Sequence, residues 1–100
     1  MQYHKLVRDR IPELIRKNGG NPKLHCADCI TFGYALKNKL REEVEEFCQS
    51  EKPEEIADIL EVIEEICRYH GFSQKSVERI KKKKAKEKGR FRKRIILEEA

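Results

Sequence analysis

The chain has 100 residues, of which 38% are hydrophobic and 41% are charged, and its formal net charge is +5. This length predicts one domain over residues 1–100, with a thin hydrophobic core. No apolar run approaches the length that crosses a membrane, and the first residues lack the pattern of a secretory leader, so we expect a soluble, cytoplasmic protein with no membrane partner. Four cysteines in such a chain indicate reduced thiols.

The charge is distributed unevenly along the chain. Residues 1–78 carry 12 basic and 15 acidic side chains, whereas residues 79–94 carry 11 basic side chains and one acidic one. A basic segment is typical of nucleic-acid-binding proteins, but it also complements an anionic small molecule held at an acidic centre. Because the core is small, burial against further copies is favourable, and we expect a homodimer or homotetramer.

The first predicted helix is short. It follows Asp9, taken as its N-cap, carries Pro12 in its first turn and stops at Gly19-Gly20. Residues 23–31 then form a connector without a clear period.

Two longer helices are predicted over residues 32–48 and 53–69, the second beginning at Pro53 and ending before Gly71. The apolar stripe of the first consists of Leu36, Leu40, Val44 and Phe47. The buried side of the second consists of Ile56, Ile59, Leu60, Ile63, Ile66 and Cys67. Because the loop between them is short, we expect the two helices to be antiparallel neighbours.

A fourth helix is predicted from the N-cap Ser73 to Gly89, with Val77 and Ile80 as its apolar contacts. The tail over residues 90–100 contains Ile95-Ile96-Leu97, which indicates an extended segment that lies back on the helices or reaches a partner subunit. The predicted fold class is therefore all-α, with four helices, an antiparallel acidic helix pair and an extended C-terminal tail.

The acidic helix pair carries two pairs of carboxylates. Glu43 and Glu46 are three residues apart, as are Glu55 and Asp58, and this spacing puts each pair on one helix face. Two such helices side by side would direct four acids to one spot, where their repulsion requires a positive charge. A hard divalent cation is the simplest answer.

Several stretches together resemble a known family. KLVRDRIPELI at residues 5–15, followed by NGGNP, KLREEVEEF, EEIADILEV and KGRFRKRIIL, resembles the small house-cleaning branch of the all-α nucleoside triphosphate pyrophosphohydrolases. This is the MazG-like superfamily, which includes phosphoribosyl-ATP pyrophosphatase. The chain departs from the family pattern in three places: only eight residues separate Glu46 from Glu55, HCADC replaces a more acidic connector, and the tail is more basic.

The resemblance implies Mg²⁺-dependent hydrolysis of a nucleoside triphosphate, in this branch a noncanonical one, to the monophosphate and pyrophosphate. It implies four metal ligands, for Mg²⁺ or Mn²⁺ as a substitute, which are Glu43, Glu46, Glu55 and Asp58. Glu61 and Glu42 flank these acids, and Glu61, one turn beyond Asp58, is the better candidate for the catalytic base. The cations available to bind the substrate are Lys5, Arg8, Lys39, Lys83, Arg90 and Arg94.

Three other functional interpretations stay open at this point. The acidic helices could simply be solvated and paired with lysine and arginine. The basic run at Lys81 to Lys84 could make the chain a nucleic-acid-binding module, although no aromatic residues interleave it for base stacking, so nucleic acid is not the expected partner. The chain could also be a helical, antitoxin-like scaffold without catalysis.

The cysteines and histidines offer a separate alternative. Cys26-x-x-Cys29, preceded by His25, could be half of a zinc site or a redox pair, or ordinary thiols. Cys48 and Cys67 fall on apolar helix faces, where small buried thiols are common. His4 and His70 have no partner at a metal-binding spacing and are interpreted as incidental.

Overall fold

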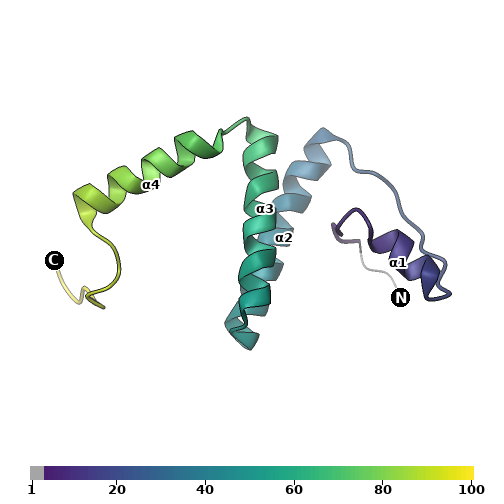
Figure 1. Ribbon diagram of the computed structural model, residues 1–100, viewed down its shortest axis with the longest axis horizontal. Helices are drawn as coiled ribbons and strands as arrows, with labels where there is room; N and C mark the ends of the chain where they lie inside the picture. The colour runs from purple at the N-terminus through teal and green to yellow at the C-terminus, as the bar shows by residue number, and fades with distance from the viewer. Residues whose placement is uncertain (1–3) are drawn as a thin grey trace.

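A computed structural model describes residues 4–100. The described chain is all-helical and contains no strand. Its four helices are α1 (Ile11–Lys17), α2 (Cys29–Ser50), α3 (Pro53–His70) and α4 (Gln74–Lys88) (Figure 1). The prediction of an all-α fold with four helices is confirmed.

Helix α1 begins one residue later than its predicted cap implies. Arg10, not Asp9, occupies the N-cap position, and its side chain makes no capping hydrogen bond. A turn precedes the helix, because the Ile11 N–H donates to the Arg8 carbonyl oxygen at 3.0 Å. The helix ends at Lys17, and Gly19 follows in the left-handed region with φ of 85°, so the predicted stop is confirmed.

Helix α2 begins at Cys29, three residues earlier than predicted. Asp28 is its N-cap, and the Asp28 side chain accepts a 2.8 Å hydrogen bond from the Thr31 N–H. The helix ends at Ser50, where Glu51 adopts a left-handed conformation with φ of 56°. Only Glu51 and Lys52 separate α2 from α3, so the two helices form a tight antiparallel hairpin, as predicted.

The boundaries of α3 and α4 agree closely with the sequence. Pro53 lies in the first turn of α3, and Gly71 closes the helix with φ of 74°. Ser73 caps α4 by accepting a 3.1 Å hydrogen bond from the Ser76 N–H, and Gly89 ends that helix. Single residues at the helix ends therefore determine where α3 and α4 begin and end.

The open end of the hairpin is tied by Tyr69. Its hydroxyl donates a 2.9 Å hydrogen bond to the Cys29 carbonyl oxygen, and its ring meets Phe32 edge-on at 5.9 Å between centroids. Gly33 makes this approach possible, because a Cβ atom there would lie 2.5 Å from the Tyr69 hydroxyl oxygen. The end of α3 is thereby held against the start of α2.

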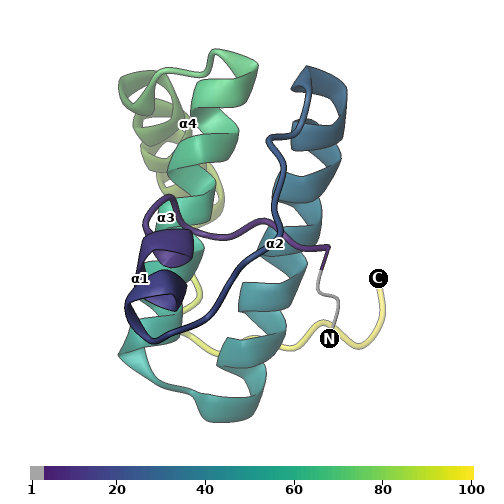
Figure 2. The same cartoon turned by 90° about the vertical axis from the view of Figure 1, so that its right-hand side faces the viewer.

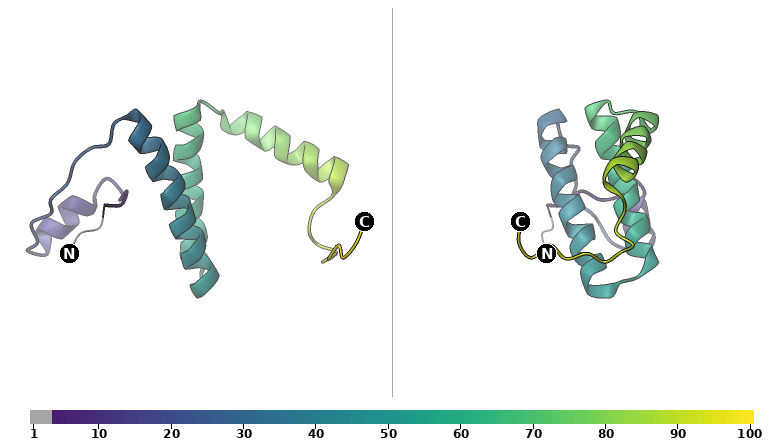
Figure 3. Two further views of the ribbon diagram at one scale, coloured as in Figure 1. Left: turned by 180° about the vertical axis from the view of Figure 1, so that it is seen from behind. Right: turned by 90° about the vertical axis from the view of Figure 1, so that its left-hand side faces the viewer.

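The core of the described chain is small and lies between α2 and α3 (Figure 3). Leu36 of α2 is 2% exposed, and Val62 and Cys67 of α3 are also buried. On α2, the predicted apolar stripe is only partly buried, since Leu40 and Phe47 are half-buried and Val44 is exposed.

The predicted buried side of α3 is wrong for half of its members. Cys67 is buried and Ile59 and Ile66 are half-buried, whereas the exposed residues are Ile56, Leu60 and Ile63. The reason is the rotation of α3, which turns Val62 and the acids Glu55 and Asp58 toward α2 and the remaining apolar stripe outward.

The molecule is elongated, measuring 55 × 31 × 23 Å along its principal axes. The N-terminal segment and α1 cross one face of the hairpin, whereas α4 projects away on the other side (Figure 2). The tail does not lie back on the helices, because Phe91, Ile95, Ile96 and Leu97 are all strongly exposed. No helix in residues 4–100 is long and apolar enough to span a membrane.

Candidate metal centre

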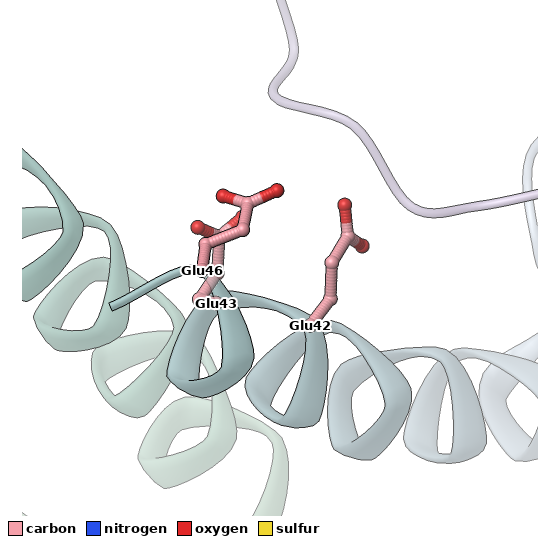
Figure 4. A group of neighbouring side chains, drawn as sticks. All are labelled: Glu42, Glu43 and Glu46. Carbon is pink, nitrogen blue, oxygen red and sulfur yellow. The ribbon is translucent and has the colours of Figure 1, made fainter. Parts of the chain in front are cut away.

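Carboxylates from α2 and α3 gather in two groups that share Glu43. One group contains Glu42, Glu43 and Glu46, and the other contains Glu43, Glu55 and Asp58. Within each group, one oxygen from every member lies within 4.8 Å of the others. Figure 4 shows Glu43 and Glu46 with their carboxylates close together and Glu42 directed toward the N-terminal segment.

The tight turn at residues 51–52 produces this arrangement. It places the last turns of α2 beside the first turns of α3, so each helix contributes one i,i+3 pair of acids. The short spacer between Glu46 and Glu55 thus brings the two pairs together. It does not put all four predicted ligands in one group, because Glu46 belongs to the neighbouring group with Glu42.

Glu43 is the most unusual of these acids, because its residue is only 5% exposed. Its Oε1 atom lies 3.2 Å from the Lys39 ammonium, whereas its Oε2 atom is buried without a hydrogen-bond partner among the described residues. A buried carboxylate oxygen without a donor is costly. A further positively charged group that contacts Oε2 of Glu43 would therefore stabilise this site.

Repulsion within the cluster affects Glu46. The nearby Glu43 carboxylate is the largest cause of a raised pKa of Glu46, followed by partial desolvation and by the charges of Glu42 and Glu55. Glu46 is exposed, so solvent screens much of this effect. A cation bound between these acids would relieve the same repulsion.

Basic residues already neutralise part of the cluster. An Arg8 guanidinium nitrogen donates to Asp58 at 2.7 Å, and the other lies 4.0 Å from Glu61. On α2, the Lys39 ammonium lies 3.4 Å from Glu42 in addition to its contact with Glu43. The partner of Arg8 is fifty positions away in sequence, so this contact fixes the N-terminal segment over the hairpin.

Lys5 provides a third cation, with its ammonium 3.4 Å from Glu42. We call the surface formed by these groups the acidic face. It comprises the six acids Glu42, Glu43, Glu46, Glu55, Asp58 and Glu61 and the three bases Lys5, Arg8 and Lys39. Negative charges outnumber positive charges by three, so the face retains capacity for a divalent cation.

The remaining predicted substrate-binding residues lie elsewhere. Lys83 is on α4, where its ammonium is 3.9 Å from Glu87, and Arg90 and Arg94 are in the tail. Because α4 leaves the hairpin on the side opposite the N-terminal segment, these three cations are not brought to the acidic face of their own chain (Figures 1 and 2).

A hollow of about 200 Å³ opens beside the acidic face, between the N-terminal segment and α2. Its lining includes Leu6, Thr31, Tyr34 and Asn38, together with Glu42. No sequence pattern singles out Tyr34 or Asn38, because they become part of a concave surface only where the N-terminal segment crosses α2. The structure alone identifies them as neighbours of the cluster.

The cysteines do not form a comparable site in residues 4–100. All four are free, with Cys67 buried and the other three exposed, including Cys48. His25, Cys26 and Cys29 do not converge as a group of metal ligands in the described chain. The geometry therefore favours the carboxylates as the candidate metal centre.

Comparison of the chain with protein-family models, with curated proteins and with solved structures finds no match.

Proposed function

We propose that the chain hydrolyses a nucleoside triphosphate, in the first place a noncanonical one, to the monophosphate and pyrophosphate with Mg²⁺. The observation that carries this proposal is the buried Oε2 atom of Glu43, which has no hydrogen-bond partner in residues 4–100 and belongs to the acid shared by the two carboxylate groups. The sequence resemblance described above supplies the reaction, and the acidic face supplies residues that suit it.

The donor set fits a hard cation that prefers oxygen ligands. Glu43, Glu55 and Asp58 would hold one ion, and Glu42 and Glu46 would complete a second position around the shared Glu43. Mg²⁺ bound there, or Mn²⁺ in its place, would supply positive charge against the phosphate oxygens and lower the pKa of water in the site.

Arg8 has two roles in this proposal. Without an ion it neutralises Asp58 through the 2.7 Å contact, and with an ion on Asp58 its guanidinium is free to bind phosphate oxygens in a bidentate manner. Lys5 and Lys39 lie on the same face and add positive charge for the rest of the triphosphate.

Glu61 is the proposed general base. It lies one turn beyond Asp58, its side chain is about half exposed, and its 4.0 Å ion pair with Arg8 leaves it accessible to a water molecule. Glu42 is the second candidate, but its carboxylate contacts both Lys5 and Lys39. Those contacts suit Glu42 better to orienting water than to accepting its proton.

The decisive experiment measures pyrophosphate release from a panel of canonical and modified nucleoside triphosphates, with Mg²⁺ and with a chelator. We expect Mg²⁺-dependent release from at least one of them. Release should be lost in Glu43→Gln and kept in Glu54→Gln. Glu54→Gln is the matched control, because Glu54 lies in the first turn of α3 but outside both carboxylate groups. The absence of release from every nucleotide would reject the enzyme and favour a scaffold without catalysis.

A second candidate function is nucleic-acid binding by α4. The observation that favours it is the projection of this helix from the hairpin with eight basic and two acidic side chains (Figure 1). It requires tight, salt-sensitive binding to single strands or duplexes that is lost when Lys81 to Lys84 are replaced by glutamine. Unchanged binding of that variant would reject this candidate.

A further inference from the structure

The hollow between the N-terminal segment and α2 adjoins the acidic face. Its lining includes Lys39 and Glu42, which both belong to that face. Figure 4 shows the Glu42 carboxylate directed toward the N-terminal segment, which forms the other wall of the hollow. The Lys39 ammonium also lies 3.2 Å from Oε1 of Glu43, the acid that the two carboxylate groups share. A molecule that fills the hollow therefore lies directly beside any ligand held by these acids.

Helix α2 sets the distance between the hollow and the acids. Tyr34, Asn38 and Glu42 all line the hollow and follow one another at i,i+4 spacing. With a rise of about 1.5 Å per residue, Asn38 lies about 6 Å and Tyr34 about 12 Å along the helix from Glu42. In a nucleoside triphosphate, a single sugar ring separates the base from the α-phosphate. Phosphates at the acidic face would therefore bring the base to Asn38 and Tyr34.

The size and the walls of the hollow suit one planar ring. Pockets that hold drug-sized ligands measure roughly 300–1,000 Å³, so a hollow of about 200 Å³ takes a single base and leaves the phosphates outside it. Leu6 of the N-terminal segment is half-buried and supplies an apolar wall. Tyr34 is 66% exposed, with the Lys37 ammonium 5.8 Å from its ring centroid, so most of the ring is open for a base to stack on.

Asn38 offers the hollow hydrogen-bond donors rather than an acceptor. Nη1 of Arg41, which lies outside the hollow, donates to Oδ1 of Asn38 at 3.0 Å. Because a guanidinium can only donate, this contact fixes the amide with its oxygen toward Arg41 and leaves its NH₂ group for the hollow. Lys5 and Lys39 are donors as well, and both contact Glu42, the one acid among the described lining residues. A base that presents an acceptor to Asn38 therefore fits better than one that presents an amino group.

We infer that the hollow binds the base of the substrate, and that Asn38 selects bases with an exocyclic oxygen over bases with an amino group at the same ring position. This inference rests on the proposed function, because it takes the phosphates to lie on the acidic face. Tyr34 stacks on the base, and the Asn38 NH₂ group donates to the exocyclic oxygen. Uracil and hypoxanthine are accepted, whereas cytosine and adenine place an amino group against the Asn38 donors.

Calorimetric titration with pairs of nucleotides that differ at that ring position tests the selection. The probes are the non-hydrolysable α,β-imido analogues of dUTP and dCTP and of ITP and ATP, each with Mg²⁺. We expect each oxo analogue to bind at least about tenfold more tightly than its amino counterpart. Equal affinities, or tighter binding of the amino analogues, would overturn the inference.

Asn38→Asp reverses the sense of the hydrogen bond. Its carboxylate can keep the contact with Arg41 and presents an acceptor to the hollow. We expect the preference between oxo and amino analogues to invert, and this ratio is insensitive to a general loss of affinity. Asn21→Asp makes the same change of charge at an exposed position between α1 and α2, outside the hollow, and should leave the preference as it is. An unchanged preference in Asn38→Asp would reject the inference.

Tyr34→Leu tests the stacking. It should weaken the binding of all four analogues by about tenfold and keep their order, because the base loses its stacking partner. Phe72→Leu removes an exposed ring outside the hollow and serves as the control. Equal affinities of Tyr34→Leu and Phe72→Leu would show that the base binds elsewhere.

The binding measurements separate this inference from the proposed function. Selective, Asn38-dependent binding without pyrophosphate release from the parent nucleotides would reject hydrolysis and keep the base site. Pyrophosphate release without a base preference would keep the proposed function and reject the inference. Failure of every analogue to bind would reject the base site.

Discussion

Two sets of side chains on the α2–α3 hairpin differ in what they lack. The acidic face has three more negative than positive charges and a buried carboxylate oxygen without a donor among the described residues. The other set consists of four large apolar side chains that no element in residues 4–100 covers, which are Val44, Ile56, Leu60 and Ile63. A two-helix hairpin is too small to bury both sets, so the acids suit a cation and the apolar side chains stay exposed.

The largest expected effect comes from removing one ligand of the acidic face. In Asp58→Asn we expect turnover to fall by about three orders of magnitude, because an amide oxygen carries no charge to hold the ion. The rate of pyrophosphate release at saturating Mg²⁺ measures this loss. The helical circular dichroism spectrum should be unchanged, since Asp58 is only half-buried.

Leu60→Asp is the matched control on the same helix. It should leave turnover within a few-fold of that of the unsubstituted protein, because Leu60 is exposed and lies outside both carboxylate groups. Turnover of Asp58→Asn within a few-fold of the unsubstituted protein would mean that the acids of α3 do not hold the ion.

The next largest effect is stabilisation by the ion itself. At a free Mg²⁺ concentration of about one hundred times its Kd, binding to the folded state alone should add about 2.7 kcal/mol to the free energy of unfolding. Thermal or urea denaturation with Mg²⁺ and with chelator measures it. Glu43→Gln should lose this increment and Glu54→Gln should retain it; equal increments in both variants would place the ion outside the Glu43 groups.

Replacing Arg8 should have opposite effects on Mg²⁺ affinity and on kcat/KM. Because Arg8 competes with an ion for Asp58, Arg8→Gln should tighten Mg²⁺ binding by a few-fold to about tenfold. The same substitution should lower kcat/KM by about tenfold, because a phosphate-binding cation is lost. Calorimetric Mg²⁺ titration and steady-state kinetics measure the two effects. Weaker ion binding in Arg8→Gln would show that Arg8 only supports the fold of the N-terminal segment.

A substitution of Glu43 should also show how much the candidate site lowers the free energy of unfolding. Replacing Glu43 with methionine removes a buried, unpartnered oxygen and fills a similar volume, so in chelator we expect the free energy of unfolding to rise by about 1 kcal/mol. Urea denaturation measures the change, and Glu45→Met, at an exposed position on the same helix, serves as the control. A loss of stability specific to Glu43→Met would show that the Lys39 contact outweighs the unpartnered oxygen.

The sequence predicted those features that depend on one residue or on local spacing. Pro53, Gly71, Ser73 and Gly89 act through their own backbone or side-chain preferences, and the structure places a helix boundary at each of them. The carboxylate pairs depend only on the helical repeat and on a short turn, so their approach to one another also followed from spacing.

The features that depend on contacts between distant segments could not be predicted. Helix α3 carries apolar residues around more than half of its circumference, so periodicity alone did not show that Val62 would be buried and Leu60 exposed. The contact between Arg8 and Asp58 joins residues fifty positions apart and leaves no local pattern. The direction of α4 was equally invisible, which is why Lys83 was predicted to serve a site that its own chain does not bring near.

The smallest expected effect concerns Asp28, on which the start of the hairpin depends. The Thr31 N–H that donates to its carboxylate holds the pKa of Asp28 below the ordinary value of 3.8. A depressed folded-state pKa means that this cap stabilises the fold above the unfolded-state value and loses its contribution as the pH falls through the folded-state value. Asp28→Asn keeps a capping oxygen without a charge. The Tm of the unsubstituted protein should therefore exceed that of Asp28→Asn at about pH 6, and the difference should shrink toward about pH 2.5. A difference that stays constant over this range would show that the charge of Asp28 contributes nothing to the cap, and that the hydrogen bond alone defines the start of α2.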